Sequence, residues 1–171
     1  MSGHVIICHG LQSSPEASKA IALADAAQAL GWSCERPDFR DLDQLGQLGD
    51  VLARIERLRQ QAATQPAPLV LAGSSMGAFI CARVSLQVPV RGLFLMAPPT
   101  QLQGYDIRLD AAPVPTRIVH GWHDELIPAG EVVRWAQTRS VHLVLVDDSH
   151  RLADHVGLCA DEFARFLQGL S

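Results

Sequence analysis

The sequence predicts an α/β fold in which a parallel sheet lies between two layers of helices. Short apolar runs alternate along the chain with longer segments of helical periodicity, a pattern typical of such sheets. Hydrophobic residues occupy consecutive positions in these runs, as expected for strands buried on both faces. Six strands are predicted, at residues 4–8, 32–37, 69–72, 92–96, 116–120 and 142–146.

Helices are expected between these strands. The first is predicted to begin at Ser14-Pro15-Glu16, which offers a serine cap, a proline at the first helical position and an acidic residue. Gly31 would end this helix. Further helices are expected at residues 75–88, 128–138 and 153–167, whereas residues 97–114 show no clear helical pattern.

The segment before the third strand predicts an amphipathic helix, because its apolar residues recur at helical spacing. The expected apolar face consists of Leu45, Leu48, Leu52, Ile55 and Leu58. The charged residues expected to point mostly outward are Arg54, Glu56, Arg57 and Arg59.

Composition narrows the possible classes of protein. A chain of 171 residues with 48% hydrophobic and 19% charged residues favours one ordinary globular domain, residues 1–171. The net charge of −4 argues against nucleic acid as the main partner. The composition is compatible with a monomer or a homodimer.

Several features favour a cytoplasmic location. The first residues lack the basic and apolar regions of a signal peptide, and no apolar run approaches the length of a membrane span. The four cysteines lie far apart and lack C-x-x-C spacing, so free thiols in a reducing compartment are expected.

The third strand runs into Gly73-Ser-Ser75-Met-Gly77, which fits the nucleophile-elbow pattern G-x-S-x-G. In this motif a sharp turn between strand and helix presents a serine hydroxyl above the sheet. The glycines are needed because a tight turn leaves no room for a Cβ on either side of the serine. Ser75 is expected as the first residue of the following helix and as the nucleophile.

A serine hydroxyl needs a base within hydrogen-bond reach, itself oriented by a third group. His150, in the turn after the last strand, is the candidate base, and Asp124, just past the fifth strand, is the candidate acid. The order serine, aspartate, histidine is the one expected for this elbow. Three other acids remain alternatives for the third position, namely Glu125, Asp106 and Asp110.

An acyl-transfer site also needs donors for the oxyanion. The expected donors are the main-chain N–H groups of Met76 and of Leu11, which lies in the turn after the first strand. His9-Gly10 would hold that turn, since Gly10 allows close approach of the backbone to a ligand. Trp122, Met96 and Pro98 are candidates for lining the acyl pocket, together with Met76.

These motifs give the chain its resemblance to the α/β-hydrolases. His9-Gly10, Gly73-Ser-Ser75-Met-Gly77, His120-Gly-x-x-Asp124 and Ser149-His150 match four landmarks of that superfamily in order. Cys8-His-Gly-Leu-Gln-Ser-Ser-Pro15, followed by Lys19-Ala20, is similar to the start of small bacterial YqiA-type esterases. The segment from Gly121 to Pro128 looks more like carboxylesterases of the dienelactone hydrolase kind.

The resemblance implies a three-layer α/β/α-hydrolase fold, with two departures. The first strand comes at the very start, so a minimal sheet of six parallel strands in the order 2-1-3-4-5-6 is expected instead of eight strands. Residues 97–114 are too few for the helical lid found in most relatives. A shallow, open site is therefore expected, which favours small or exposed acyl groups.

The sequence thus predicts a serine hydrolase of small carboxylic esters that works through an acyl-enzyme and needs neither metal nor organic cofactor. A thioesterase or peptidase with the same three residues remains open. So does a non-catalytic binding module, since fold does not imply function.

Overall fold

The computed structural model describes residues 2–44, 46–102 and 105–170. Its sheet has six strands in the order β2-β1-β3-β4-β5-β6, and every neighbouring pair is parallel. This confirms the predicted sheet and strand order. The strands are β1 (His4–Cys8), β2 (Ser33–Glu35), β3 (Leu69–Ser74), β4 (Gly92–Met96), β5 (Thr116–Gly121) and β6 (His142–Val146).

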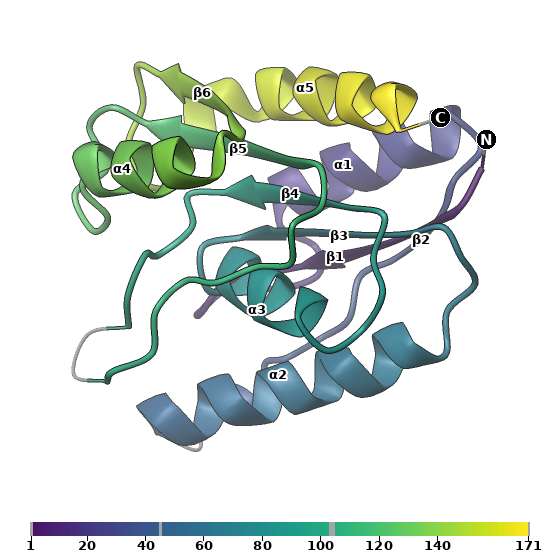
Figure 1. Ribbon diagram of the computed structural model, residues 1–171, viewed down its shortest axis with the longest axis horizontal. Coiled ribbons are helices and arrows are strands. Elements are labelled where there is room, and N and C mark those ends of the chain that lie inside the picture. The colour runs from purple at the N-terminus through teal and green to yellow at the C-terminus, as the bar shows by residue number, and fades with distance from the viewer. Residues whose placement is uncertain (1, 45, 103–104, 171) are drawn as a thin grey trace.

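Helices cover both faces of the sheet and complete three layers (Figure 1). On one face α1 (Ser18–Ala29) packs beside α5 (Val156–Gly169), and their apolar residues share a cluster with β1, β3 and β4. A second cluster on the opposite face is formed with the remaining helices, α2 (Gln47–Ala63), α3 (Met76–Ser85) and α4 (Ala129–Arg139).

The first helix begins later than the sequence predicts, at Ser18 instead of Pro15. The Ser14 hydroxyl accepts a hydrogen bond from the Glu16 N–H, and the Ser14 carbonyl accepts one from Ala17. Because these bonds close a separate turn, the serine caps that turn and not the helix. The closing segment also differs, since residues Ala153–His155 form a 3₁₀ turn before α5.

The second helix shows the largest difference from the predicted pattern. Leu52, expected on the apolar face, is 52% exposed, whereas Arg54, expected to point outward, is completely buried. The inward face instead runs through Val51, Arg54, Leu58 and Ala62. A hydrophobicity pattern cannot find this register, because the buried arginine is polar and is satisfied by partners on other segments. Leu45 lies outside the described residues.

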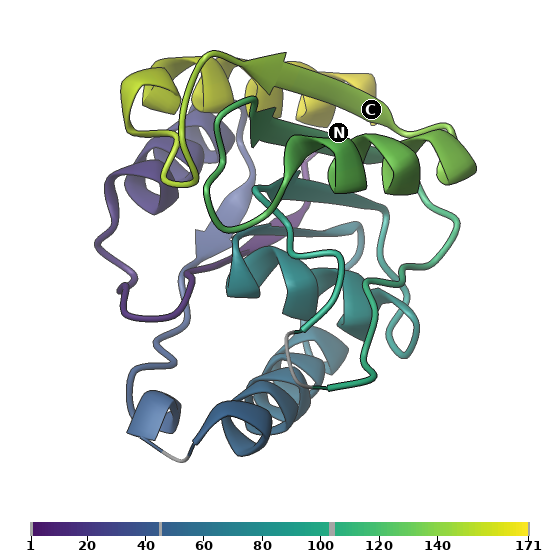
Figure 2. The same ribbon diagram turned by 90° about the vertical axis from the view of Figure 1, so that its left-hand side faces the viewer.

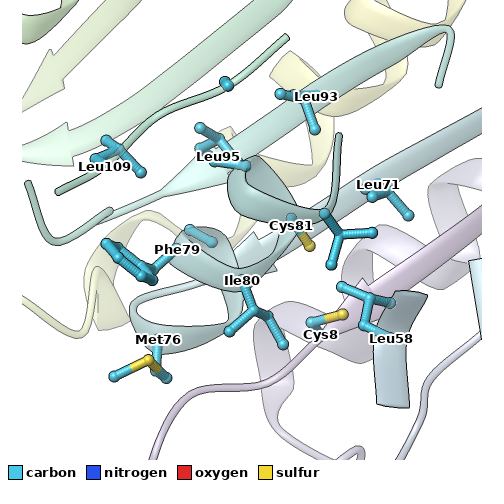
Figure 3. Packing of buried hydrophobic residues seen from close by; sticks show 14 of the residues in the cluster. Cys8, Leu58, Leu71, Met76, Phe79, Ile80, Cys81, Leu93, Leu95 and Leu109 are labelled. Carbon is cyan, nitrogen blue, oxygen red and sulfur yellow. The ribbon is translucent and has the colours of Figure 1, made fainter. Parts of the chain in front are cut away.

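The elbow region is packed without spare space. Leu58 of α2, Ile80 of α3 and Cys8 of β1 gather in the cluster beneath it (Figure 3). At Gly77 the backbones of α3 and β1 come so close that a Cβ would lie 2.0 Å from the Cys8 carbonyl oxygen. This approach fixes the start of α3 against the end of β1.

The segment after β4 contains no helix in its described parts, residues 97–102 and 105–114, as the sequence predicts. It forms an isolated antiparallel bridge between Gln101 and Arg108. None of the described helices is long and apolar enough to span a bilayer.

We predict that Gly77→Ala destabilises the protein by about 3 kcal/mol or more, because its Cβ would overlap backbone atoms that have no room to move. Urea unfolding followed by circular dichroism measures the change. Gly157→Ala is the matched control, since nothing lies within 4 Å of its added Cβ. Equal stability of the two variants would contradict the close approach.

Candidate active site

Ser75 occupies a sharp turn between β3 and α3. Its backbone has φ 55° and ψ −119°, a left-handed conformation that is costly for a residue with a side chain. The Ser75 N–H donates a hydrogen bond of 2.8 Å to the Met96 carbonyl at the end of β4. Ser75 is therefore the residue that caps α3, and not the first helical residue as expected.

His150 lies within hydrogen-bond distance of both other members of the predicted set. Its Nε2 is 2.9 Å from the Ser75 Oγ, and its Nδ1 is 2.7 Å from the Asp124 Oδ2. The three residues belong to the turns after β3, β5 and β6, which open on the sheet edge that faces the viewer in Figure 2. The structure thus brings together residues that are up to 75 positions apart in the chain.

The Asp124 carboxylate is buried and fully engaged. Its Oδ1 accepts the main-chain N–H groups of Leu126 and Ile127 at 2.9 and 2.7 Å, which leaves Oδ2 for His150. Burial acts to raise the pKa of Asp124, but the hydrogen bonds from His150 and the two amides outweigh it, so this pKa lies below its ordinary value. The carboxyl group is therefore ionised at neutral pH.

The alternative acids do not contact the His150 ring. Glu125 accepts the His150 main-chain N–H at 3.2 Å, and Asp110 is paired with Arg139. Asp106 is exposed. Asp124 is therefore the one of the four candidates that the structure places against the imidazole.

Further contacts hold the loop that carries His150. The Lys19 Nζ of α1 donates to the Arg151 carbonyl at 2.5 Å, and His155 Nδ1 lies 2.8 Å from the Asp148 carboxylate. Burial lowers the pKa of Lys19. These bonds tie the residues on both sides of His150 to α1 and to the start of α5.

The expected oxyanion donors, Met76 and Leu11, lie in two adjoining turns. A Cβ at Gly10 would lie 3.3 Å from Ser75 Cβ and 4.0 Å from the Met76 nitrogen, so the turn after β1 rests directly on the elbow. Within the described part of the chain, neither the Leu11 nor the Met76 N–H donates a hydrogen bond to another protein group. Their role as oxyanion donors stays a prediction.

Comparison with known proteins agrees with this fold. The model of the alpha/beta hydrolase family matches residues 5–170. The chain belongs to the alpha/beta hydrolase family. No curated protein matches it significantly by sequence.

Solved structures support the same assignment. A Xanthomonas campestris protein described as a candidate hydrolase of the alpha/beta superfamily shares 56% identity over 98% of this chain and 99% of its own, with a TM-score of 0.94. A serine hydrolase homologue from Coxiella burnetii shares 27% identity over 96% and 85%, with a TM-score of 0.75. A lidless serine hydrolase from X. campestris, at 23% identity over 97% and 81%, shares the fold with a TM-score of 0.75.

The predicted pocket residues of this alpha/beta hydrolase differ in accessibility. Trp122 is 56% exposed and open to a bound ligand, whereas Pro98 is buried. Met96 is 1% exposed and packs in the cluster next to α1 and α5. Met76, also buried, packs in the opposite cluster. A role for these four residues in acyl binding stays a prediction.

Sequence reasoning gave no role at the site to two buried residues that lie beside it. His120 lies with its Nε2 2.9 Å from the Ile127 carbonyl and 3.4 Å from the Asp124 carboxylate, and burial lowers its pKa. The position of His120, four residues before Asp124, was a sequence signal that could have identified it. Arg54 contacts the turn after β1, and no local sequence pattern predicts that contact.

The described residues contain no group of three or more His, Cys, Asp or Glu side chains arranged to hold a metal ion. The polar side chains around Ser75 are instead engaged with one another.

We predict that Asp124→Asn lowers the free energy of unfolding at pH 7 and that its difference from the wild type shrinks in acid. The folded-state pKa of Asp124 lies below its unfolded value. The stabilisation is therefore complete above about pH 4 to 5 and is lost as the pH falls through the folded pKa. Urea unfolding of both proteins between pH 7 and pH 3 tests this, and a difference that stays constant would contradict it.

Proposed function

We propose that this hydrolase cleaves small carboxylic esters, with Ser75 as nucleophile, His150 as general base and acid, and Asp124 as the orienting carboxylate. The observation that carries the proposal is the continuous pair of contacts from Ser75 Oγ to His150 and from His150 to Asp124. A surface serine has no need of a base oriented by a buried carboxylate, whereas a nucleophile does.

The contacts fix which ring nitrogen carries the proton. Since the ionised Asp124 can only accept, the Nδ1–H of His150 donates to it. In the neutral ring, Nε2 is then the nitrogen without a proton; it faces the Ser75 hydroxyl and can accept its proton. The developing positive charge on the ring then lies beside a buried negative charge, which stabilises it.

The reaction proceeds in two halves. Ser75 Oγ attacks the ester carbonyl carbon while its proton passes to His150, and the resulting oxyanion accepts hydrogen bonds from the Leu11 and Met76 amides. His150 then protonates the departing alcohol, which leaves an acyl group on Ser75. A water molecule, deprotonated by His150, repeats the attack and releases the acid.

The absence of a helix in the described parts of residues 97–114 supports small or exposed acyl groups as substrates. With no helical lid over the site from this segment, a long acyl chain would stay in contact with water and contribute little binding. We place the enzyme in the cytoplasm, in line with its four unpaired cysteines, and expect a monomer or a homodimer.

We predict that Ser75→Ala and His150→Ala each lower the turnover of p-nitrophenyl acetate by at least about 1000-fold, because the three residues act as a unit. Ser140→Ala and His142→Ala, exposed positions between the end of α4 and the start of β6 at the opposite edge of the sheet, are the matched controls and should match the wild type. Substantial activity in either site variant would refute the assignment.

Acyl-chain length provides a second prediction. Across p-nitrophenyl esters from acetate to laurate, we expect kcat/KM to be highest for the short esters and not to rise with length, since an open site adds little apolar contact per methylene. A steady rise through laurate would show a buried acyl channel. Higher activity on matched thioesters or peptides would favour the corresponding alternative substrate.

A further inference from the structure

We propose that Arg54 is a positioning residue for the oxyanion site and acts by fixing the Gly10–Leu11 peptide. The inference rests on the proposed esterase function, in which the Leu11 N–H contacts the oxyanion. The carbonyl that Arg54 approaches and the N–H that would bind the oxyanion are the two ends of one peptide group.

Arg54 lies in the middle of α2 with its side chain completely buried. Its Nη1 donates to the His9 carbonyl at 3.1 Å, and its Nη2 lies 3.5 Å from the Gly10 carbonyl. The same guanidinium donates to the Asp43 carboxylate and lies 5.1 Å from the centre of the Phe39 ring. It thus joins α2 to the turn that follows β1.

A buried charge is costly unless its hydrogen-bonding groups are satisfied. Asp43 supplies the compensating negative charge, but an ion pair alone could form at the surface for less cost. The remaining N–H groups of Arg54 point to two successive carbonyls of the His9-Gly10 turn. That turn carries Leu11, so the contacts of the buried Arg54 bear on the position of the Leu11 N–H.

The His9 ring also binds the Gly10 carbonyl. The Phe39 main-chain N–H, which can only donate, lies 3.0 Å from His9 Nε2, so the proton of the neutral ring resides on Nδ1. His9 Nδ1 lies 2.8 Å from the Gly10 oxygen and donates to it. Burial lowers the pKa of His9, which keeps the ring neutral in this arrangement.

Peptide geometry links these contacts to the oxyanion. The C=O and N–H of a trans peptide are coplanar and point in opposite directions, so holding the Gly10 oxygen also sets the direction of the Leu11 N–H. Hydrogen bonds to the carbonyl polarise the peptide and strengthen its N–H as a donor. The elbow lies beside this peptide, since a Cβ at Gly10 would be 3.3 Å from Ser75 Cβ.

The test uses Arg54→Met in the full-length enzyme, with p-nitrophenyl acetate as substrate and phenylboronic acid as inhibitor. The boronic acid adds to the serine oxygen as a tetrahedral anion and thus probes oxyanion binding. We expect kcat to fall by about 10- to 100-fold and the inhibition constant to rise by at least about tenfold, while KM changes by less than about threefold.

The inhibition constant separates positioning from a structural role. Loss of folded protein lowers the apparent kcat but leaves the affinity of the remaining active enzyme unchanged. Arg59→Met is the matched control, because Arg59 lies on the same helix and, among the residues that the structure describes, pairs only with Glu56 at the surface. An unchanged inhibition constant in Arg54→Met would overturn the proposal.

One further variant covers the case in which Arg54→Met does not fold. Arg54→Lys keeps a cation but loses the planar fork, so we expect a rise of about 3- to 10-fold in the inhibition constant. An unchanged inhibition constant in Arg54→Lys would count against the proposal.

Failure of the inference is distinguishable from failure of the proposed function. If the esterase proposal is wrong, the wild type does not hydrolyse the ester, or Ser75→Ala hydrolyses it equally well. If only the inference is wrong, Ser75→Ala is inactive while Arg54→Met matches the wild type in kcat and inhibitor affinity.

Discussion

The close approach of α3 to the end of β1 is the constraint on which the rest of the site depends. Gly77 lies against the Cys8 carbonyl, and a Cβ at Gly73 would lie 2.4 Å from the Gly77 carbonyl carbon. With these backbones in contact, the chain must turn sharply between strand and helix, and Ser75 takes the left-handed conformation. The same contact brings the turn after β1 onto the elbow. One packing constraint therefore places the proposed nucleophile and both expected oxyanion donors together.

Polar side chains around this constraint are bonded to main-chain groups of the surrounding loops. Asp124 binds two amides of its own loop besides His150, Lys19 holds the carbonyl of Arg151, and Arg54 holds the turn after β1. Such bonds determine the positions of short loops that have little apolar surface of their own. Loops held in this way suit a reaction in which hydrogen-bond donors must already be in position when charge develops in the transition state.

Much of the fold was predictable from the sequence, because apolar strand runs and interruptions by glycine and proline are local signals. Residues 92–96 and 142–146 coincide with β4 and β6, and the strand order followed from the family resemblance. The contacts of Ser75, Asp124 and His150 were also expected, since each residue follows a strand that ends at the same edge. The predictions for Arg54 and Leu52 were wrong. A buried arginine is stabilised by tertiary partners, and the periodicity of hydrophobic residues carries no information about them.

The central claim is that Ser75 carries the acyl group during turnover. The most direct measurement is to mix the wild-type enzyme with p-nitrophenyl acetate, quench the reaction in acid within the first turnover, and locate the modification by peptide mass spectrometry. The account predicts one acetyl group on the peptide that contains Ser75. Turnover with no acetylated peptide, or with the acetyl group on another residue, would contradict it.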